Sequence, residues 1–246
     1  MRYAKGRPDF HSNTIRYIQK YLQLDKKLGK ALDIACGTGL STKALLDIAE
    51  KVFGTDSSKE MLNFAKKDDR IYYSVALAEQ QPFGDNQFDL ITVSSGVHWF
   101  DIDKFLVEAN RILRSKAWLV LYENHFIAEM EGNEKFPEWF RDVYLNKFPS
   151  PPRNNAYPWT NENLVPKNFR VLNEEKFKNS ITFNKKQLAL YFTTQSNIIA
   201  AVESKRATYE EVEAWLEHEL SVFFDRDDSV HSIIYGNWIK YLQKAT

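Results

Sequence analysis

The first half of the chain alternates short continuous apolar runs with stretches in which apolar residues recur at helical spacing. The apolar runs predict strands over about 31–35, 51–56, 71–76, 88–94 and 118–122. The helical spacing predicts a leading helix within 10–24 and later helices over about 40–50 and 103–113. Ser57 and Glu60 form a capping-box signal for another helix, ending near Ala65. Strands that alternate with helices predict a parallel sheet with right-handed crossovers.

The regular alternation stops after the fifth predicted strand. Residues 124–170 hold six of the eight prolines and many aromatic residues, among them Trp139 and Trp159. A flexible linker would be poor in aromatic residues, so disorder is not expected here. We therefore interpret 124–170 as a folded substrate cap rather than as another strand–helix unit, with Trp139 and Trp159 as part of it.

The strand–helix pattern resumes near 177–183, which predicts a sixth strand. Asn184 has the chemistry of an N-cap for a helix over about 185–202, and Thr208 with Glu211 forms a second capping box. A seventh strand is expected over 231–242. The predicted fold class is α/β, with a central, mostly parallel seven-stranded sheet and helices on both faces. Its core comprises 1–123 and 171–246, with the cap inserted after strand five.

Composition narrows the possible partners of this 246-residue chain. Lys and Arg together number 33, as do Asp and Glu, so the formal charge is zero and no basic excess indicates a nucleic-acid partner. One cysteine excludes an internal disulfide and makes a reducing, cytoplasmic location the expectation. The start of the chain lacks an apolar signal core, and no segment has the ~18–20 apolar residues of a membrane span. We expect a small-molecule partner, no membrane, no metal ligands, and a monomer or homodimer.

The chemistry concentrates in a glycine turn that follows the first predicted strand. Gly37 and Gly39 come directly before a helical pattern, and Asp56 ends the next apolar run. Two strand ends, a glycine turn and a carboxylate predict a nucleoside site at the carboxyl edge of a parallel sheet. A dinucleotide turn would have a third glycine where Thr42 stands, and Asp33 before the turn favours a cationic ligand over a pyrophosphate. The alternative is an ordinary turn in which glycine serves geometry only. Cys36, inside the turn, is interpreted as a small packed residue rather than a nucleophile, because no partner thiol or neighbouring base is visible.

The motif from Asp33 to Gly39, Asp-x-x-Cys-Gly-x-Gly, resembles the first motif of class I S-adenosylmethionine-dependent methyltransferases. The order and spacing of four further segments resemble the small-molecule branch of that family: 54–62, 78–90, 94–101 and 108–113. The run from His98 to Asp101 resembles the trans-aconitate methyltransferase-like group in particular. This resemblance is firm over 30–122. It implies a Rossmann-like class I methyltransferase fold with S-adenosyl-L-methionine as cofactor, and with 1–29 as a segment over the cofactor.

The resemblance also implies roles for individual residues. Asp56 would accept the two ribose hydroxyls, as suits a carboxylate with two acceptor oxygens, or else it caps the following helix. Asp33 would hold the methionine ammonium, directly or through water. Met61 would cover the adenine face or belong to the core, and Trp99 would face the sulfonium or be a core aromatic. The other implied cofactor-binding residues are Tyr3, Ala35, Gly37, Gly39, Ser57, Ala78, Glu79, Ser94 and Ser95.

Two positions depart from the pattern of the family. Leu77 stands where an aspartate is frequent, so Glu79 or backbone would contact the adenine amino group instead. A Pro-Gly-Gly turn is absent after Leu113, where we expect consequences for stability rather than function.

The expected function is methyl transfer to a small molecule, with a carboxylic acid as the first candidate acceptor. A carboxylate acceptor needs no base, whereas a phenol, amine or carbon acceptor needs one. His98 is the candidate catalytic base, and a packing or hydrogen-bonding histidine is the alternative. The rival functions are C- or N-methylation of a quinone-like or amine substrate, a cofactor-binding regulatory protein without catalysis, and a nicotinamide-dependent oxidoreductase.

Overall fold

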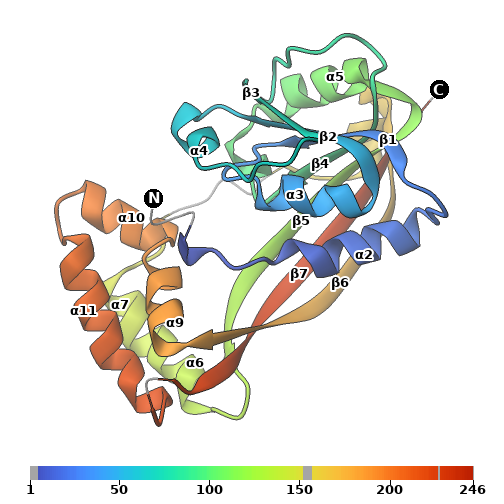
Figure 1. Cartoon of the computed structure of the whole chain (residues 1–246). Coiled ribbons are helices and arrows are strands. Elements are labelled where there is room, and N and C mark those ends of the chain that lie inside the picture. Colours follow the sequence, from blue (N-terminus) through green and yellow to red (C-terminus); the bar gives the residue numbers. More distant parts are fainter. Residues whose placement is uncertain (1–4, 152–156, 227, 246) are drawn as a thin grey trace. The chain divides into compact units, whose positions relative to one another are not determined.

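The computed structural model describes residues 5–151, 157–226 and 228–245 (Figure 1). The chain divides into two compact units. The sheet unit, as we call it, comprises Phe10–Asn124, Asn154–Phe177 and Asn237–Thr246. The helical unit comprises Met1–Asp9, His125–Arg153 and Lys178–Gly236.

Seven strands form one sheet in the order β3-β2-β1-β4-β5-β7-β6. Strands β1 to β5 pair in parallel, as the alternating pattern predicts. The last three strands are long, and each contributes residues to both units. The strands are β1 (Leu28–Ile34), β2 (Ala49–Asp56), β3 (Ile71–Val75), β4 (Phe88–Ser94), β5 (Leu113–Met130), β6 (Phe169–Asn184) and β7 (Val230–Lys244).

Strand β7 runs opposite to both of its neighbours. Trp238 donates a hydrogen bond to Glu123 of β5, whereas Gln243, further along β7, donates to the earlier Lys116 carbonyl. On the other side Lys240 forms an ion pair with Glu174 of β6, and the Ala245 N–H, further along, donates to the earlier Asn168 carbonyl. The sheet is therefore mixed but mostly parallel, which confirms the predicted fold class.

Helices cover both faces of the parallel strands because neighbouring strand residues point to opposite sides. Ala31 and Val120 pack on one side with Ile15 and Ile18 of α2 (His11–Tyr21). The next residues, Leu32 and Leu121, pack on the other side with α5 (Ile102–Ile112). The remaining helical segments of the sheet unit are α3 (Leu40–Ala44), η1 (Leu45–Asp47), α4 (Lys59–Asn63), η2 (Val97–Trp99), α8 (Asn161–Leu164) and η4 (Val165–Lys167).

The helical unit has an aromatic core. Trp139 is 7% exposed, packs against Phe136, Phe192 and Phe223, and donates its indole N–H to Glu219 at 3.0 Å. The segments of this unit are α6 (Lys135–Trp139), η3 (Phe140–Tyr144), α7 (Leu145–Lys147), α9 (Lys185–Phe192), α10 (Ser196–Glu203), α11 (Tyr209–Leu220) and η5 (Ser221–Phe223). No helix in the described part of the chain has the length and apolar character to cross a membrane.

Three predicted helices differ from those observed. The helix expected over 40–50 ends earlier, because Ala49 already pairs with Leu28 in the β1–β2 ladder. The N-cap of α4 is Ser58, not Ser57, since Asp56 accepts the Ser58 N–H and thereby sets the helix start one residue later. The helix expected over 185–202 is two helices.

The break between α9 and α10 has a local cause. The hydroxyls of Thr193 and Thr194 donate to the Leu190 and Tyr191 carbonyls, at 2.7 and 2.6 Å. Such side-chain bonds compete with the helical ladder and favour its end. The two predicted N-caps, Asn184 and Thr208, are both confirmed as capping boxes.

The region interpreted as a cap is divided differently from the prediction. Strand β5 extends to Met130, well past its predicted end near 122. Within 124–170, residues 125–153 belong to the helical unit, whereas residues 154–170 belong to the sheet unit. The helical unit also takes in 178–236, so its core combines segments that are distant in sequence. Hydrophobic patterns along the chain do not show which distant segments share a core.

Candidate active site

The turn after β1 lies in the left-handed backbone region at three positions. The φ angles are +56° at Ala35, +53° at Gly37 and +72° at Gly39. Left-handed backbone is costly for residues with a Cβ, and at Gly39 a Cβ would also overlap the Tyr73 hydroxyl. At Gly37 an added Cβ would meet only the Met61 methyl, at 3.7 Å. The space beside Gly37 and Met61 is therefore open to a ligand.

Asp56 connects this turn to the start of α4. One carboxylate oxygen accepts the Gly37 N–H and the other accepts the Ser58 N–H, each at 2.8 Å. The side chain is half-buried at the carboxyl end of β2. A carboxylate offers about four acceptor positions, so two remain after these bonds. Asp56 both supports the turn and keeps acceptor capacity for a ligand.

Asp33 lies beneath the turn instead of lining it. It is fully buried, and its carboxylate accepts hydroxyl bonds from Ser41 at 2.6 Å, Thr42 at 2.7 Å and Thr92 at 3.1 Å. Burial raises the pKa of Asp33 to about 6, against the lowering effect of these bonds. With no exposed surface, Asp33 offers no direct contact to a bound ammonium. Burial likewise raises the pKa of the Cys36 thiol well above its usual value, which fits packing beneath the turn.

The turn after β4 lies against the glycine turn. A Cβ at Gly96 would stand 2.7 Å from the Ala35 Cβ, so the two backbones approach closely there. Ser94 ends β4 and pairs with Tyr122, and the exposed Ser95 has φ +54° and donates its N–H to the Tyr122 carbonyl. The ends of β1, β2, β4 and β5 thus bring the predicted residues to one edge of the sheet.

The predicted adenine-side residues have different surroundings. Met61 is half-buried, and its methyl faces Gly37. Ala78 is buried in the core, and Glu79 accepts the Asp101 N–H at 2.8 Å at the start of α5. Ser57 is exposed directly after Asp56. Tyr3 lies outside the described residues.

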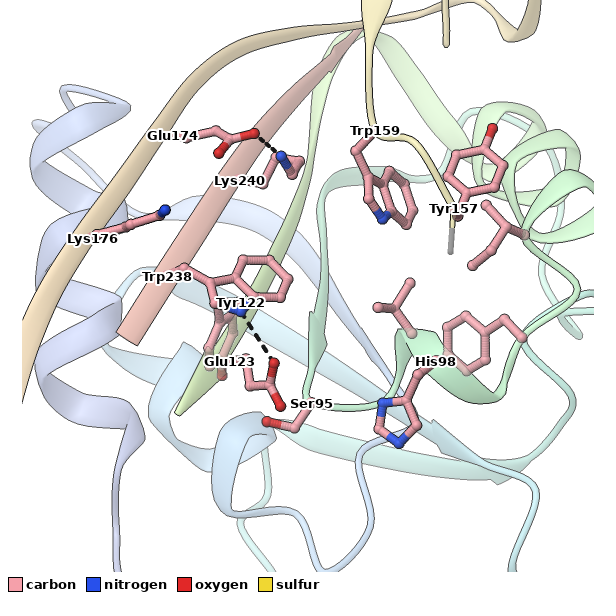
Figure 2. Close-up of a pocket in the computed structure, with 13 residues that line it drawn as sticks. Ser95, His98, Tyr122, Glu123, Tyr157, Trp159, Glu174, Lys176, Trp238 and Lys240 are labelled. Atoms are coloured by element: carbon pink, nitrogen blue, oxygen red, sulfur yellow. Dashed lines mark hydrogen bonds and ion pairs between the residues drawn. The ribbon is translucent and has the colours of Figure 1, made fainter. Parts of the chain in front are cut away.

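A cavity of about 340 Å³ lies within the sheet unit beside Ser95 (Figure 2). Its floor is the face of the sheet presented by β5, β7 and β6, and its walls come from the segment after β4 and the segment before α8. Its residues are Ser95, Val97, His98, Phe100, Ile102, Tyr122, Glu123, Tyr157, Trp159, Glu174, Lys176, Trp238 and Lys240.

Both charged and aromatic side chains line this cavity. Trp238 donates its indole N–H to Glu123 at 3.1 Å, and Lys240 forms an ion pair with Glu174. Burial lowers the pKa of Lys240, whose side chain is 12% exposed. Figure 2 shows Ser95, Glu123 and His98 along one side, whereas Lys176 and the Glu174–Lys240 pair lie on the side away from His98.

His98 and Trp99 have rings 5.0 Å apart between centroids, but they differ in their surroundings. His98 lines the cavity, where a base for an acceptor would be needed. Trp99 is 80% exposed, so the alternative of a core aromatic is wrong. Of the two tryptophans expected in a substrate cap, Trp159 lines the cavity, whereas Trp139 belongs to the core of the helical unit.

Sequence reasoning missed the polar and aromatic residues of the cavity floor, which lie on β5, β6 and β7. Glu123, Lys176, Trp238 and Lys240 come from three strands that are separated by long segments. Lys176 lies two residues after Glu174, and Lys240 two after Trp238, which puts each pair on one face of its strand. This two-residue spacing is visible in the sequence, but the sequence does not show which strands are neighbours in the sheet.

Comparisons with known proteins agree with this geometry. Residues 32–121 match the family model described as a methyltransferase domain. A protein of Dictyostelium discoideum named as a methyltransferase is 31% identical over 132 residues, 54% of this chain and 49% of that protein. A ubiquinone/menaquinone biosynthesis C-methyltransferase of Rickettsia prowazekii is 34% identical over 146 residues, 52% of this chain and 56% of that protein. The chain spans about half the length of the curated relatives it matches.

Solved structures share the fold across nearly the whole chain. A structure from Anaeromyxobacter dehalogenans, titled as a type II methyltransferase, has a TM-score of 0.74 at 19% identity and covers 96% of this chain and 97% of that one. One from Bacillus halodurans, titled as a methyltransferase, has a TM-score of 0.58 at 20% identity and covers 95% and 100%. The fold is the Rossmann-like fold of class I methyltransferases, whose cofactor is S-adenosylmethionine.

The residues at the strand ends suit that cofactor. The two remaining acceptor positions of Asp56 match a ribose diol, and a side chain at Gly37 would occupy the open space beside Met61. The buried Asp33 carboxylate beneath the turn favours a cationic ligand over a pyrophosphate, and Thr42 stands where a dinucleotide turn has its third glycine. The site of this chain therefore fits S-adenosylmethionine better than a dinucleotide.

Proposed function

We propose that this protein transfers a methyl group from S-adenosylmethionine to a small molecule held in the cavity of the sheet unit. One observation carries the proposal: Ser95 lines the cavity and belongs to the turn that lies against the glycine turn at Ala35. A cofactor held by Asp56 and the glycine turn would have a small-molecule cavity next to its site. The volume of about 340 Å³ suits a small acceptor.

The cofactor supplies a methyl group that is already activated by its positively charged sulfur. The protein's own part is alignment and exclusion of water. Asp56 and the Gly37 turn would hold the nucleoside, and the rings of Phe100, Trp159 and Trp238 would orient a flat acceptor and keep water out. His98 lines the same cavity and would take a proton from an acceptor that carries one.

An organic acid is the first candidate acceptor, because the exposed Lys176 lines the cavity and can attract an anion. The resemblance of His98–Asp101 to the trans-aconitate methyltransferase-like group points the same way. A quinone-like acceptor is the second candidate, favoured by the similarity to the Rickettsia prowazekii C-methyltransferase named above. A cofactor-binding regulatory role without catalysis is disfavoured, since a cavity lined by His98 lies beside the proposed cofactor site and can hold an acceptor.

Thermal unfolding with S-adenosylhomocysteine or NAD tests the cofactor. A ligand that binds only the folded state raises the melting temperature by mass action, so S-adenosylhomocysteine should raise it and NAD should not. Stabilisation by NAD, with no response to millimolar S-adenosylhomocysteine, would show that the central proposal is wrong. Transfer of labelled methyl to a panel of carboxylic acids, quinones, phenols and amines then tests catalysis.

A further inference from the structure

The floor of the cavity carries a row of three side chains with opposite charges at its ends. Trp238 of β7 contacts Glu123 of β5 through its indole N–H. On the other side of β7, Lys240 forms an ion pair with Glu174 of β6. Trp238 and Lys240 lie on one face of β7, Glu174 and Lys176 lie on one face of β6, and Figure 2 shows Trp238 between Glu123 and Lys176. The row across the floor is Glu123, Trp238, Lys176.

The two lysines of the cavity floor, Lys176 and Lys240, differ in their ion pairing and burial. Lys240 is mostly buried, and its ammonium is engaged by Glu174. Lys176 is exposed, lines the cavity and has no ion-pair partner among the residues that the structure describes. An anionic group of a ligand would therefore be attracted to Lys176 rather than to Lys240.

The opposite end of the row carries the negative charge of Glu123. Glu123 lies on the same side of the cavity as Ser95 and His98 (Figure 2). A carboxylate of the acceptor placed at this end would lie near the Glu123 carboxylate, and like charges brought together are unfavourable. A hydroxyl or amino group suits the place, because Glu123 accepts protons and hydrogen bonds. The charges thus favour an acid group that anchors the acceptor without receiving the methyl.

The size of the site limits what separates the two ends. Neighbouring strands lie about 4.8 Å apart, so the step from β5 across β7 to β6 is roughly 10 Å. The cavity wall includes the aromatic rings of Phe100, Tyr157 and Trp159, and the volume of the cavity is about 340 Å³. One aromatic ring with substituents at opposite positions spans such a distance and fills such a space.

We propose that the acceptor is an aromatic acid with a hydroxyl or amino group at the far end of its ring. Its carboxylate lies against Lys176, and its oxygen or nitrogen lies beside Ser95, Glu123 and His98. That atom forms a bond to the methyl carbon while the carbon–sulfur bond breaks and its electron pair stays on sulfur. The proton of the acceptor passes to Glu123 or His98, and the product keeps its carboxylate. This inference rests on the proposed methyltransferase function.

Binding to the full-length protein saturated with S-adenosylhomocysteine tests the anchor. The probes are para-hydroxyphenylpropionate, para-aminophenylpropionate, para-ethylphenol, which lacks the acid, and phenylpropionate, which lacks the nucleophile. We expect one of the first two to bind tightest, and Lys176→Met to weaken it by roughly tenfold while leaving para-ethylphenol unchanged. The control is Lys178→Met, on the same strand but paired with Glu129 and not in the cavity wall.

The second measurement identifies the methylated atom. With labelled S-adenosylmethionine, an ether or N-methyl product of the hydroxyl or amino probe keeps its label in alkali, whereas a methyl ester releases labelled methanol. Alkali-stable label on one of these two probes is expected, and which probe carries it identifies the nucleophile. Ester formation, acid probes that bind no better than para-ethylphenol, or equal effects of Lys176→Met and Lys178→Met would overturn the inference. Failure of S-adenosylhomocysteine itself to bind would instead refute the proposed function.

Discussion

Replacing Asp56 with alanine removes one carboxylate that holds two parts of the proposed cofactor site. In the structure its oxygens accept the Gly37 and Ser58 N–H groups at 2.8 Å each. The variant leaves both donors without this partner and removes the acceptor for the ribose hydroxyls. We therefore expect losses in folding stability and in cofactor affinity.

The magnitude follows from the kind of bond that is lost. Hydrogen bonds to a charged group contribute about 1.5–3 kcal/mol, and half-burial of Asp56 leaves water able to replace part of that. The free energy of unfolding should fall by about 1.5–3 kcal/mol. The same range for the lost ribose interaction corresponds to a fall in S-adenosylhomocysteine affinity of roughly tenfold to a hundredfold.

Titration calorimetry with S-adenosylhomocysteine measures the affinity, at a temperature where the variant is folded. The matched control is Glu60→Ala, which removes an exposed negative charge from the first turn of the same helix, α4. It tests the alternative that Asp56 acts only as a helix-end charge. Affinity of Asp56→Ala within twofold of wild type, or an equal loss in Glu60→Ala, would refute the reasoning.

Three further predictions concern residues away from Asp56. Burial raises the pKa of Asp33 to about 6, above its ordinary 3.8, so the folded state binds the extra proton between these values. Relative to Asp33→Asn, wild type should gain about 2.4 kcal/mol of stability as pH falls from 7 to 4, measured by urea unfolding. Urea midpoints that change equally with pH in both proteins would contradict this. Trp139→Ala should lose about 3–5 kcal/mol of stability as a core truncation, measured by denaturant unfolding; a loss below 1 kcal/mol would contradict a core role. Trp159→Ala should raise the acceptor KM with unchanged S-adenosylhomocysteine affinity, and an unchanged KM would remove Trp159 from the acceptor site.

The local patterns of the sequence were sufficient for most elements of the fold. Strand β4 has the predicted bounds, Phe88–Ser94, because a continuous apolar run marks a strand buried on both faces. The caps at Asn184 and Thr208 were predictable because a capping box involves residues only three positions apart. Element ends were less predictable: Ala49 joins β2 through pairing with Leu28, a residue outside any local window.

The candidate site divides in the same way. The glycine turn and Asp56 were recognisable because their chemistry lies in short motifs at strand ends, where a parallel sheet brings the strands together. The burial of Asp33 was not recognisable from the sequence, since the carboxylate is held beneath the turn by hydroxyls of Ser41, Thr42 and Thr92. The exposure of Trp99 beside the cavity-lining His98 was equally hidden, because exposure depends on which other segments pack against the 3₁₀ turn that carries both residues.

The sequence by itself determined the order of strands and helices, the nucleoside chemistry at the strand ends and the methyltransferase resemblance, all of which depend on nearby residues. Only the tertiary structure decided that β7 lies between β5 and β6 and runs opposite to both. That placement brings Glu123, Trp238 and Lys176 into one row, although more than fifty residues separate each from the next along the chain. Side-chain alternation sets the face on which each residue lies, but the burial of the whole sheet selects which strands become neighbours.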